Sequence, residues 1–286
     1  MTITAGQRHS SQGRPGLSPA APVRSAGVLY RAVAHESFRL GKHLPAPEIA
    51  PFVEYYWTIH WDLPDGRSHR QWVIPHPTVH LVFDPAGSAL YGVMRGRYSR
   101  LLSGTGHVLG VRFRPAGVRP FLTGPVSALT DRVLPVAESF GPVADQQARA
   151  VLDVAESSAL VAAADEFLRP RLPEKDPMTP VVAEMVRSIV EDPGMVRVDA
   201  VAERFDIGVR TLQRLFAEYV GVPPKWVLLR SRVHEAVERA GDGDIVNWAR
   251  LACDLGYSDQ AHLTRDFTRA VGQSPARYAR DCRSGE

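Results

Sequence analysis

The chain has 286 residues, more than one ordinary domain of about 100–150 residues requires, so two packed domains are expected. Hydrophobic residues make up 44%, charged residues 23% and aromatic residues 8%, which excludes wholesale disorder and a collagen-like or coiled-coil fibre. The formal net charge is +3, but this excess does not identify a partner, because Met178 to Glu286 holds 15 basic and 16 acidic residues.

The first 27 residues are rich in Ser, Gly, Pro and Ala, and their charged residues are Arg8, Arg14 and Arg24. This composition predicts a disordered tail at residues 1–27. The segment lacks the apolar core of about 7–15 residues that a signal peptide needs, and no later stretch reaches the roughly 18 apolar residues of a membrane span. We therefore expect a cytoplasmic protein without a membrane partner.

Residues 28–114 contain short segments with the alternation of β-strands. In the run 52–61 every odd position is apolar, whereas Glu54, Thr58 and His60 occupy even positions, which predicts a half-buried strand. Several short strands separated by turn signals favour a barrel or a sandwich. The expected strands are 52–61, 71–74, 78–84 and 107–114, with turns at Pro64-Asp65-Gly66 and Pro85-Ala86-Gly87.

The periodicity becomes helical after Pro115, with helices expected at 144–156 and 157–169. Residues 170–177 contain three prolines in eight residues, which predicts a domain boundary. Everything after this segment has helical periodicity, interrupted by Pro223-Pro224 and by Gly241-Asp242-Gly243-Asp244. The expected helices are 179–191, 198–205, 209–219, 224–239, 245–254, 258–270 and 275–281.

These segments predict an α+β protein with two domains. Residues 28–172 would form a mainly-β domain with trailing helices, residues 173–178 a linker, and residues 179–282 an all-α domain of seven helices.

One pattern occurs twice in the helical region, at 198–216 and at 245–267. Each copy is a short helix, a tight turn and a second helix, which is the plan of a helix-turn-helix unit. In the second helix of each copy, apolar residues recur on one face and leave a polar face near the N-terminus. The outward residues are Arg210, Thr211, Gln213 and Arg214 in the first copy and Gln260, Ala261, Thr264 and Arg265 in the second.

Arg and Gln form paired hydrogen bonds with guanine and adenine, and the N-terminal turns of a recognition helix enter the major groove. A single exposed Arg or Gln is more often a solvated surface residue, so the prediction depends on the duplication. A helix at 224–239 would be about 24 Å long, a spacer that could hold two recognition helices about one helical turn of DNA (~34 Å) apart. The sequence thus predicts a protein that reads two successive major-groove segments of double-stranded DNA.

Residues 179–282 resemble the DNA-binding domain of AraC/XylS-type transcription regulators. The resembling segments are LQRLFAEYVGVPPKW (212–226), SRVHEA (231–236) and DLGYSDQAHLTRDFTRAVGQSPARY (254–278). The resemblance implies base-reading roles for Arg210, Gln213 and Arg214 and for Gln260, Ala261, Thr264 and Arg265. Gly208 departs from the family, in which a helix-capping serine is usual, but glycine is a tolerated N-cap.

The N-terminal half resembles the sensory domain of some members of this family. The resembling segments are VEYYWTIHWD (53–62), IPHPTVHLVFD (74–84) and GVRFRPAGVRPFLTGPVSALTDRVLPV (110–136). This resemblance implies a cupin-like β-barrel followed by helices, and it names no ligand.

Together the two resemblances imply a bacterial transcription regulator without a cofactor. Its candidate partners besides DNA are a small-molecule effector, a second copy of the chain in a homodimer and, for an activator, RNA polymerase. The alternative is a ligand-independent DNA-binding regulator whose N-terminal domain only mediates oligomerisation or partner docking.

The strand-rich region also contains candidate ligand-binding residues, namely Trp57, Trp72, His76, His80 and Arg112. The aromatic side chains could equally fill the core, and Arg112 could equally form an ion pair with Glu54 or Asp84. On one strand the Cβ atoms of His76 and His80 would lie about 13 Å apart, too far to share a metal ion. We therefore expect no metal site.

The sequence contains no glycine-rich phosphate loop, no Gly-x-Ser-x-Gly motif and no Cys–His arrangement for nucleophilic catalysis. Its two cysteines, Cys253 and Cys282, are too few for a four-cysteine zinc module. The prediction is a protein that is not an enzyme.

Overall fold

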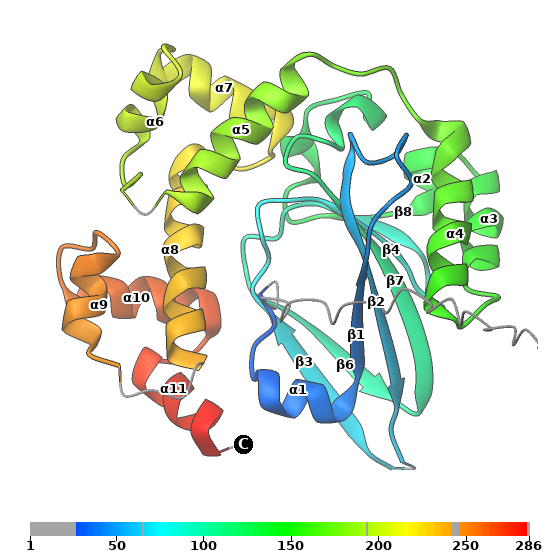
Figure 1. The fold of residues 1–286 in the computed structure, drawn as a ribbon, viewed down its shortest axis with the longest axis horizontal. Coiled ribbons are helices and arrows are strands. Elements are labelled where there is room, and N and C mark those ends of the chain that lie inside the picture. Colours follow the sequence, from blue (N-terminus) through cyan, green and yellow to red (C-terminus); the bar gives the residue numbers. More distant parts are fainter. Residues whose placement is uncertain (1–26, 65, 193, 242–245, 285–286) are drawn as a thin grey trace, which may run out of the picture.

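The computed structural model describes residues 27–64, 66–192, 194–241 and 246–284. It shows a mainly-β N-terminal part and a helical C-terminal part packed side by side (Figure 1). The expected tail apart from Gly27, the turn residue Asp65 and the predicted helix start at Ile245 lie outside the described residues.

Eight strands of the described chain form two antiparallel sheets. Six of them pair in the order β1-β2-β7-β4-β5-β8, and β3 pairs with β6. A short helix, α1 (Arg31–Ser37), precedes the first strand. The strands are β1 (Arg39–His43), β2 (Val53–Asp62), β3 (Ser68–Val73), β4 (His80–Phe83), β5 (Ala89–Tyr91), β6 (Tyr98–Ser103), β7 (Thr105–Phe113) and β8 (Val133–Pro135).

The predicted strands correspond to β2, β3, β4 and β7, and the expected mainly-β architecture is confirmed. The other four strands do not follow from the alternation pattern, because RLGKH, ALY, YSRLLS and VLP do not alternate apolar and polar residues. The sequence pattern also does not predict α1.

Both faces of β2 are covered, although the alternation predicts a half-buried strand. Tyr55, Trp57 and Ile59 point between the two sheets. The even residues Tyr56 and Thr58 are fully buried on the opposite face. Their hydroxyl groups tolerate burial there because both hydrogen-bond to side chains of α4. Tyr56 donates to Asp165 at 2.6 Å, and Thr58 pairs with Ser157, the first residue of α4.

Three helices follow the last strand and cover that face of the large sheet, namely α2 (Val136–Phe140), α3 (Val143–Val151) and α4 (Ser157–Leu168). The helix predicted at 144–156 ends earlier, at Val151. Glu156 serves instead as the N-cap of α4, where its carboxylate accepts the backbone N–H of Ala159 at 2.9 Å.

The C-terminal part contains the seven predicted helices within a few residues of the expected bounds. They are α5 (Met178–Glu191), α6 (Val198–Arg204), α7 (Val209–Tyr219), α8 (Pro224–Gly241), α9 (Trp248–Asp254), α10 (Gln260–Val271) and α11 (Pro275–Ser284).

The two helix-turn-helix units differ in how the N-termini of their helices are capped. In the second unit Asn247 accepts the backbone N–H of Arg250 at 3.0 Å, and Asp259 accepts that of His262 at 2.7 Å. In the first unit neither α6 nor α7 has a side-chain cap, and Gly208 precedes α7 in an extended conformation. The first unit therefore leaves more helix N–H groups to solvent.

Apolar packing continues across the proline-rich segment. One buried cluster runs from the sheets through α4 to α5, α6, α7 and the first half of α8. A second cluster joins the last half of α8 to α9, α10 and α11, and it includes Leu29 and Ile74 from the N-terminal part. In the described chain α8 is the helix that contributes to both clusters, so its position depends on both parts.

A stacked histidine pair joins the N-terminal part to α8. The rings of His76 and His234 lie 4.0 Å apart with an interplanar angle of 12°. Burial, with the nearby charges of Arg230 and Arg112, lowers the pKa of His234 to about 3. Burial and His234 likewise hold the pKa of His76 well below its usual value. Both rings are therefore neutral at neutral pH.

We expect the free energy of unfolding to fall as the pH is lowered from 7 to 5. A histidine in the unfolded chain titrates near pH ~6.5, whereas His234 in the folded protein titrates at about 3, so protons bind first to the unfolded state. His234→Phe keeps an aromatic ring but removes one titrating histidine. It should reduce the slope of the free energy of unfolding against pH by up to about 1.4 kcal/mol per pH unit. Urea unfolding at several pH values measures this, with the exposed His35→Gln as control; an unchanged slope in His234→Phe would contradict the prediction.

Helix capping gives a second prediction. Gly208→Ser should raise the free energy of unfolding by a few tenths of a kcal/mol, because no atom lies within 4 Å of an added Cβ and the hydroxyl can cap α7. Asn247→Ala should lower it by about 1 kcal/mol, because the capped N–H of Arg250 loses its partner. Denaturant unfolding of both variants measures the two changes in the free energy of unfolding. A lower value for Gly208→Ser than for the parent would contradict the prediction.

Candidate functional site

The first predicted recognition helix, α7, is held by a buried apolar face. Leu212 and Phe216 are fully buried. On the opposite side Arg210, Gln213 and Arg214 are exposed, and Thr211 is half-buried. Within the described part of the chain the two arginines form no hydrogen bond or ion pair, so their donors are available to a partner.

The second predicted recognition helix, α10, is organised in the same way. Leu263 and Phe267 are fully buried. The four predicted outward residues Gln260, Ala261, Thr264 and Arg265 are exposed or, in the case of Thr264, half-buried.

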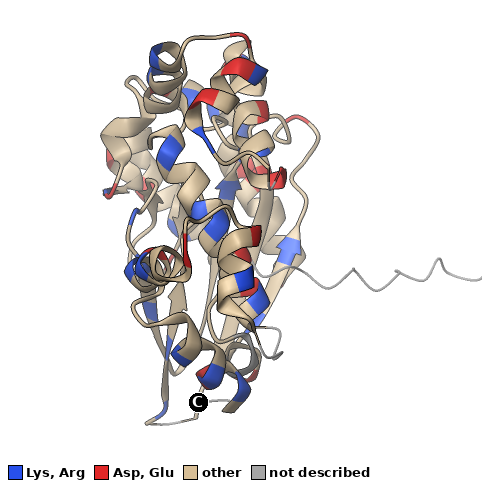
Figure 2. Ribbon diagram, turned by 90° about the vertical axis from the view of Figure 1, so that its left-hand side faces the viewer, with Lys and Arg blue, Asp and Glu red and all other residues tan. Residues whose placement is uncertain are grey.

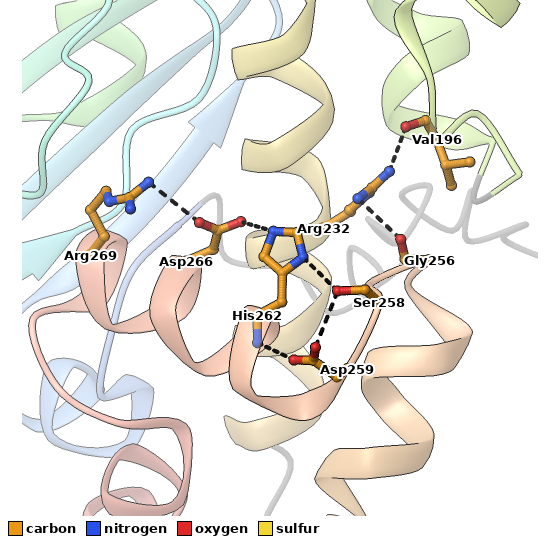
Figure 3. Close-up of polar contacts among 8 residues, drawn as sticks. All are labelled: Val196, Arg232, Gly256, Ser258, Asp259, His262, Asp266 and Arg269. Atoms are coloured by element: carbon orange, nitrogen blue, oxygen red, sulfur yellow. Dashed lines mark hydrogen bonds and ion pairs between the residues drawn. The ribbon is translucent and has the colours of Figure 1, made fainter.

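The turn before α10 is stabilised by polar contacts (Figure 3). The backbone N–H of His262, with smaller effects from Ser258 and Arg265, holds the pKa of Asp259 below its usual range. On the helix itself, His262 pairs with Ser258 at 3.2 Å and lies 3.6 Å from the carboxylate of Asp266. These contacts fix the first two turns of α10, where the predicted base-reading residues lie.

The two helices border one groove between the helix-turn-helix units. Val209, the first residue of α7, and Arg265 of α10 both line it, and α8 forms its floor. The basic residues of the groove are Arg197, Lys225, Arg232, Arg265 and Arg269, and its acidic residues are Asp199 and Asp266.

The positive charge of the groove is local. Both acidic residues are already occupied, since Asp199 pairs with Arg197 and Asp266 contacts Arg269. Lys225 and Arg265 form no ion pair within the described residues. Elsewhere on the helical side acidic and basic segments are interspersed (Figure 2). Placement of the charges, and not their total, makes this groove a candidate site for a polyanion.

A cavity of about 200 Å³ lies between the two sheets. Four of the five predicted ligand-binding residues line it, namely Trp57, His76, His80 and Arg112. Trp72 lies on the other face of β3, because its neighbours Gln71 and Val73 point into the cavity. The ring of Trp72 instead packs against the guanidinium of Arg97, 4.0 Å away.

Trp57 crosses a neighbouring strand to reach His80. Its indole covers Gly110, where an added Cβ would lie 1.9 Å from the ring, so glycine is required at this point of β7. The indole N–H donates to Nδ1 of His80 at 3.1 Å. Burial and Arg112 lower the pKa of His80 to about 3, so this histidine is neutral and carries its proton on Nε2.

One positive charge at the cavity lacks a carboxylate partner. Arg112 pairs with Glu54 at 2.7 Å, which is one of the two ion pairs anticipated from the sequence. Lys42, also on the cavity wall, lies 4.5 Å from the centre of the Tyr55 ring and forms no ion pair among the described residues. Burial, followed by the charge of Arg112, lowers its pKa. Lys42 does not follow from the sequence, because β1, with the sequence RLGKH, shows no alternation of apolar and polar residues.

No group of three or more His, Cys, Asp or Glu side chains in the described ranges is arranged to hold a metal ion. Among the described helices, none is long and apolar enough to cross a membrane.

Comparison with known proteins separates the same two parts. Residues 41–135 match a family described as a domain of unknown function (DUF6597), and residues 201–281 match a helix-turn-helix domain family, HTH_18. Similar proteins include the HTH-type transcriptional activator RhaS of Escherichia coli O139:H28 (strain E24377A / ETEC), 35% identical over 89 residues. RhaS of Pectobacterium carotovorum subsp. carotovorum (strain PC1) is 34% identical over 76 residues.

The match to RhaS of Escherichia coli spans 30% of this chain and 30% of the relative. The match to RhaS of Pectobacterium carotovorum spans 27% of each. Among solved structures, ToxT from Vibrio cholerae aligns with 85% of this chain and 98% of its own, at 11% identity and a TM-score of 0.38. The chain thus carries a region that matches the helix-turn-helix family HTH_18 behind an N-terminal region that matches the DUF6597 family.

Proposed function

We propose that the protein is a sequence-specific, DNA-binding transcription regulator that reads two successive major-groove segments. The observation that carries this proposal is the pair of packed helices α7 and α10. Each exposes a polar face to solvent, and Val209 of α7 and Arg265 of α10 line one basic groove. The relatives that match this region are transcriptional activators by name, which supports the same function.

In this proposal residues 179–282 bind DNA, residues 173–178 link the two parts, and residues 28–172 form the sensory part. Arg210, Gln213 and Arg214 would read bases in one segment, and Gln260, Thr264 and Arg265 would read the next, with Thr211 and Ala261 beside them. Because Arg210, Arg214 and Arg265 form no ion pair in the described part of the chain, DNA binding need not break one to engage these side chains.

Arg210→Ala and Arg265→Ala should each weaken binding to the specific site by about 1–3 kcal/mol and relax base preference locally. The site is first obtained by selection from random duplexes, and affinities are then measured by fluorescence anisotropy. Arg187→Ala is the matched control, because Arg187 is exposed on α5 and its ion pair among the described residues is with Glu184 of its own helix. Parental affinity in both test variants would contradict the assignment of recognition helices.

We further propose that the cavity between the sheets binds a small-molecule effector. A cavity of about 150 Å³ can hold benzene. The cavity of about 200 Å³ therefore suits an effector with one ring and a short substituent. The unpaired Lys42 beside Arg112 favours an acidic group on that molecule. His76 supports a polar contact as well, since its Nε2 is buried without a hydrogen-bond partner in the described chain.

A thermal-shift series tests the effector. Benzoate, phenylacetate and hexanoate are compared with their neutral amides on the full chain and on Lys42→Met. A ligand at about 100 Kd should add about 2.7 kcal/mol of stability, and the gain should be lost in Lys42→Met. No saturable shift with any acid would favour the ligand-independent alternative, in which residues 28–172 mediate homodimerisation or docking to a partner such as RNA polymerase.

A further inference from the structure

We propose that Arg232 is a positioning residue that fixes the angle and separation of α7 and α10, and so determines which spacing between two DNA segments the protein accepts. The inference rests on the proposed DNA-binding function and goes beyond it, because Arg232 need not touch a base.

Arg232 lies near the middle of α8 and is hydrogen-bonded to both helix-turn-helix units (Figure 3). One terminal nitrogen, Nη2, donates to the carbonyl of Val196 at 2.6 Å, just before α6 of the first unit. The other, Nη1, lies 3.4 Å from the carbonyl of Gly256, in the turn of the second unit.

The two units also touch directly at this point. Gly256 has a φ of +69°, and an added Cβ would lie 2.8 Å from Cγ1 of Val196. Glycine at position 256 therefore serves both the left-handed turn and the close approach. The guanidinium of Arg232 sits beside the contact and joins the same two backbone segments.

A chain of ring contacts extends from Arg232 to the second recognition helix. The guanidinium lies 5.4 Å from the centre of the Tyr257 ring, and that ring meets His262 edge-on at 5.1 Å. His262 belongs to the first turn of α10, and its backbone N–H is bonded to the cap residue Asp259. A rotation of the turn around Gly256 and Tyr257 would therefore also rotate α10.

The first unit is connected through Val196. This residue lines the groove together with Val198, the first residue of α6, and Val209, the first residue of α7. An arginine suits the junction because its planar fork offers two terminal nitrogens to two carbonyls, whereas the ammonium of a lysine is a single point of contact. Nε of Arg232 is buried without a hydrogen-bond partner among the described residues, so the terminal nitrogens account for its directional bonds.

The test compares the full chain with Arg232→Met, which keeps an apolar stem, and with Arg232→Lys. Each protein is titrated with the selected duplex, with duplexes carrying one or two extra base pairs between the two segments, and with duplexes carrying one segment only. Arg187→Met on α5 is the matched control.

In the parent each inserted base pair should weaken binding by about tenfold or more, because the two segments are no longer engaged together. Arg232→Met should bind the selected duplex about tenfold more weakly and lose most of the penalty for insertions. Its affinity for single segments should fall by a smaller factor, because the variant also loses one positive charge of the groove. The insertion penalty of Arg232→Lys should lie between those of the parent and Arg232→Met. Arg187→Met should bind every duplex like the parent.

A uniform loss of affinity on every duplex, with an unchanged spacing profile and a lower Tm, would show a merely structural role and overturn the inference. Parental spacing dependence in Arg232→Met would overturn it as well. Failure of the parent to select any duplex would instead refute the proposed function itself, so the two failures are distinguishable.

Discussion

The packing of α8 is the constraint on which the rest of the molecule depends. Its first half belongs to the apolar cluster that includes the sheets and α5 to α7, and its last half belongs to the cluster around α9 to α11. On one side, Arg230 donates to the carbonyl of Arg95 and His234 stacks on His76. Between the two units, Arg232 reaches one carbonyl on each. A single helix thus holds both helix-turn-helix units and the N-terminal part in one arrangement.

This arrangement places the cavity and the helical part in direct contact. His76 is part of the cavity wall and also stacks on α8, with both histidines kept neutral by burial. Arg230 is buried beside them, which lowers its pKa to about 10, so it remains charged at neutral pH. The desolvation cost of that charge is offset by its bond to the Arg95 carbonyl and by the Trp226 ring, 4.6 Å away.

Local charge, more than net charge, explains what the helical part can bind. The region after Met178 has a slight excess of acidic residues, yet the groove between its two units has five basic residues and two occupied acidic ones. The acids of this region lie mostly outside the groove. Glu184 and Glu235 pair with arginines of their own helices, whereas Glu218 pairs with Arg119 of the N-terminal part. Electrostatic attraction of DNA depends on this placement.

The sequence by itself determined the seven C-terminal helices, the two helix-turn-helix units and their outward faces, because caps, proline and glycine interruptions and helical periodicity are local signals. It also identified β2, β3, β4 and β7, and four residues that the fold brings to one cavity. Only the tertiary structure decided that Trp72 faces away from that cavity, that Lys42 enters it, and that Arg232 meets Val196 and Gly256. Those contacts depend on which strands pair and on how separate helices pack. Val196 and Gly256 lie 36 and 24 positions from Arg232 along the chain, and contacts at such separations produce no periodic pattern in the sequence.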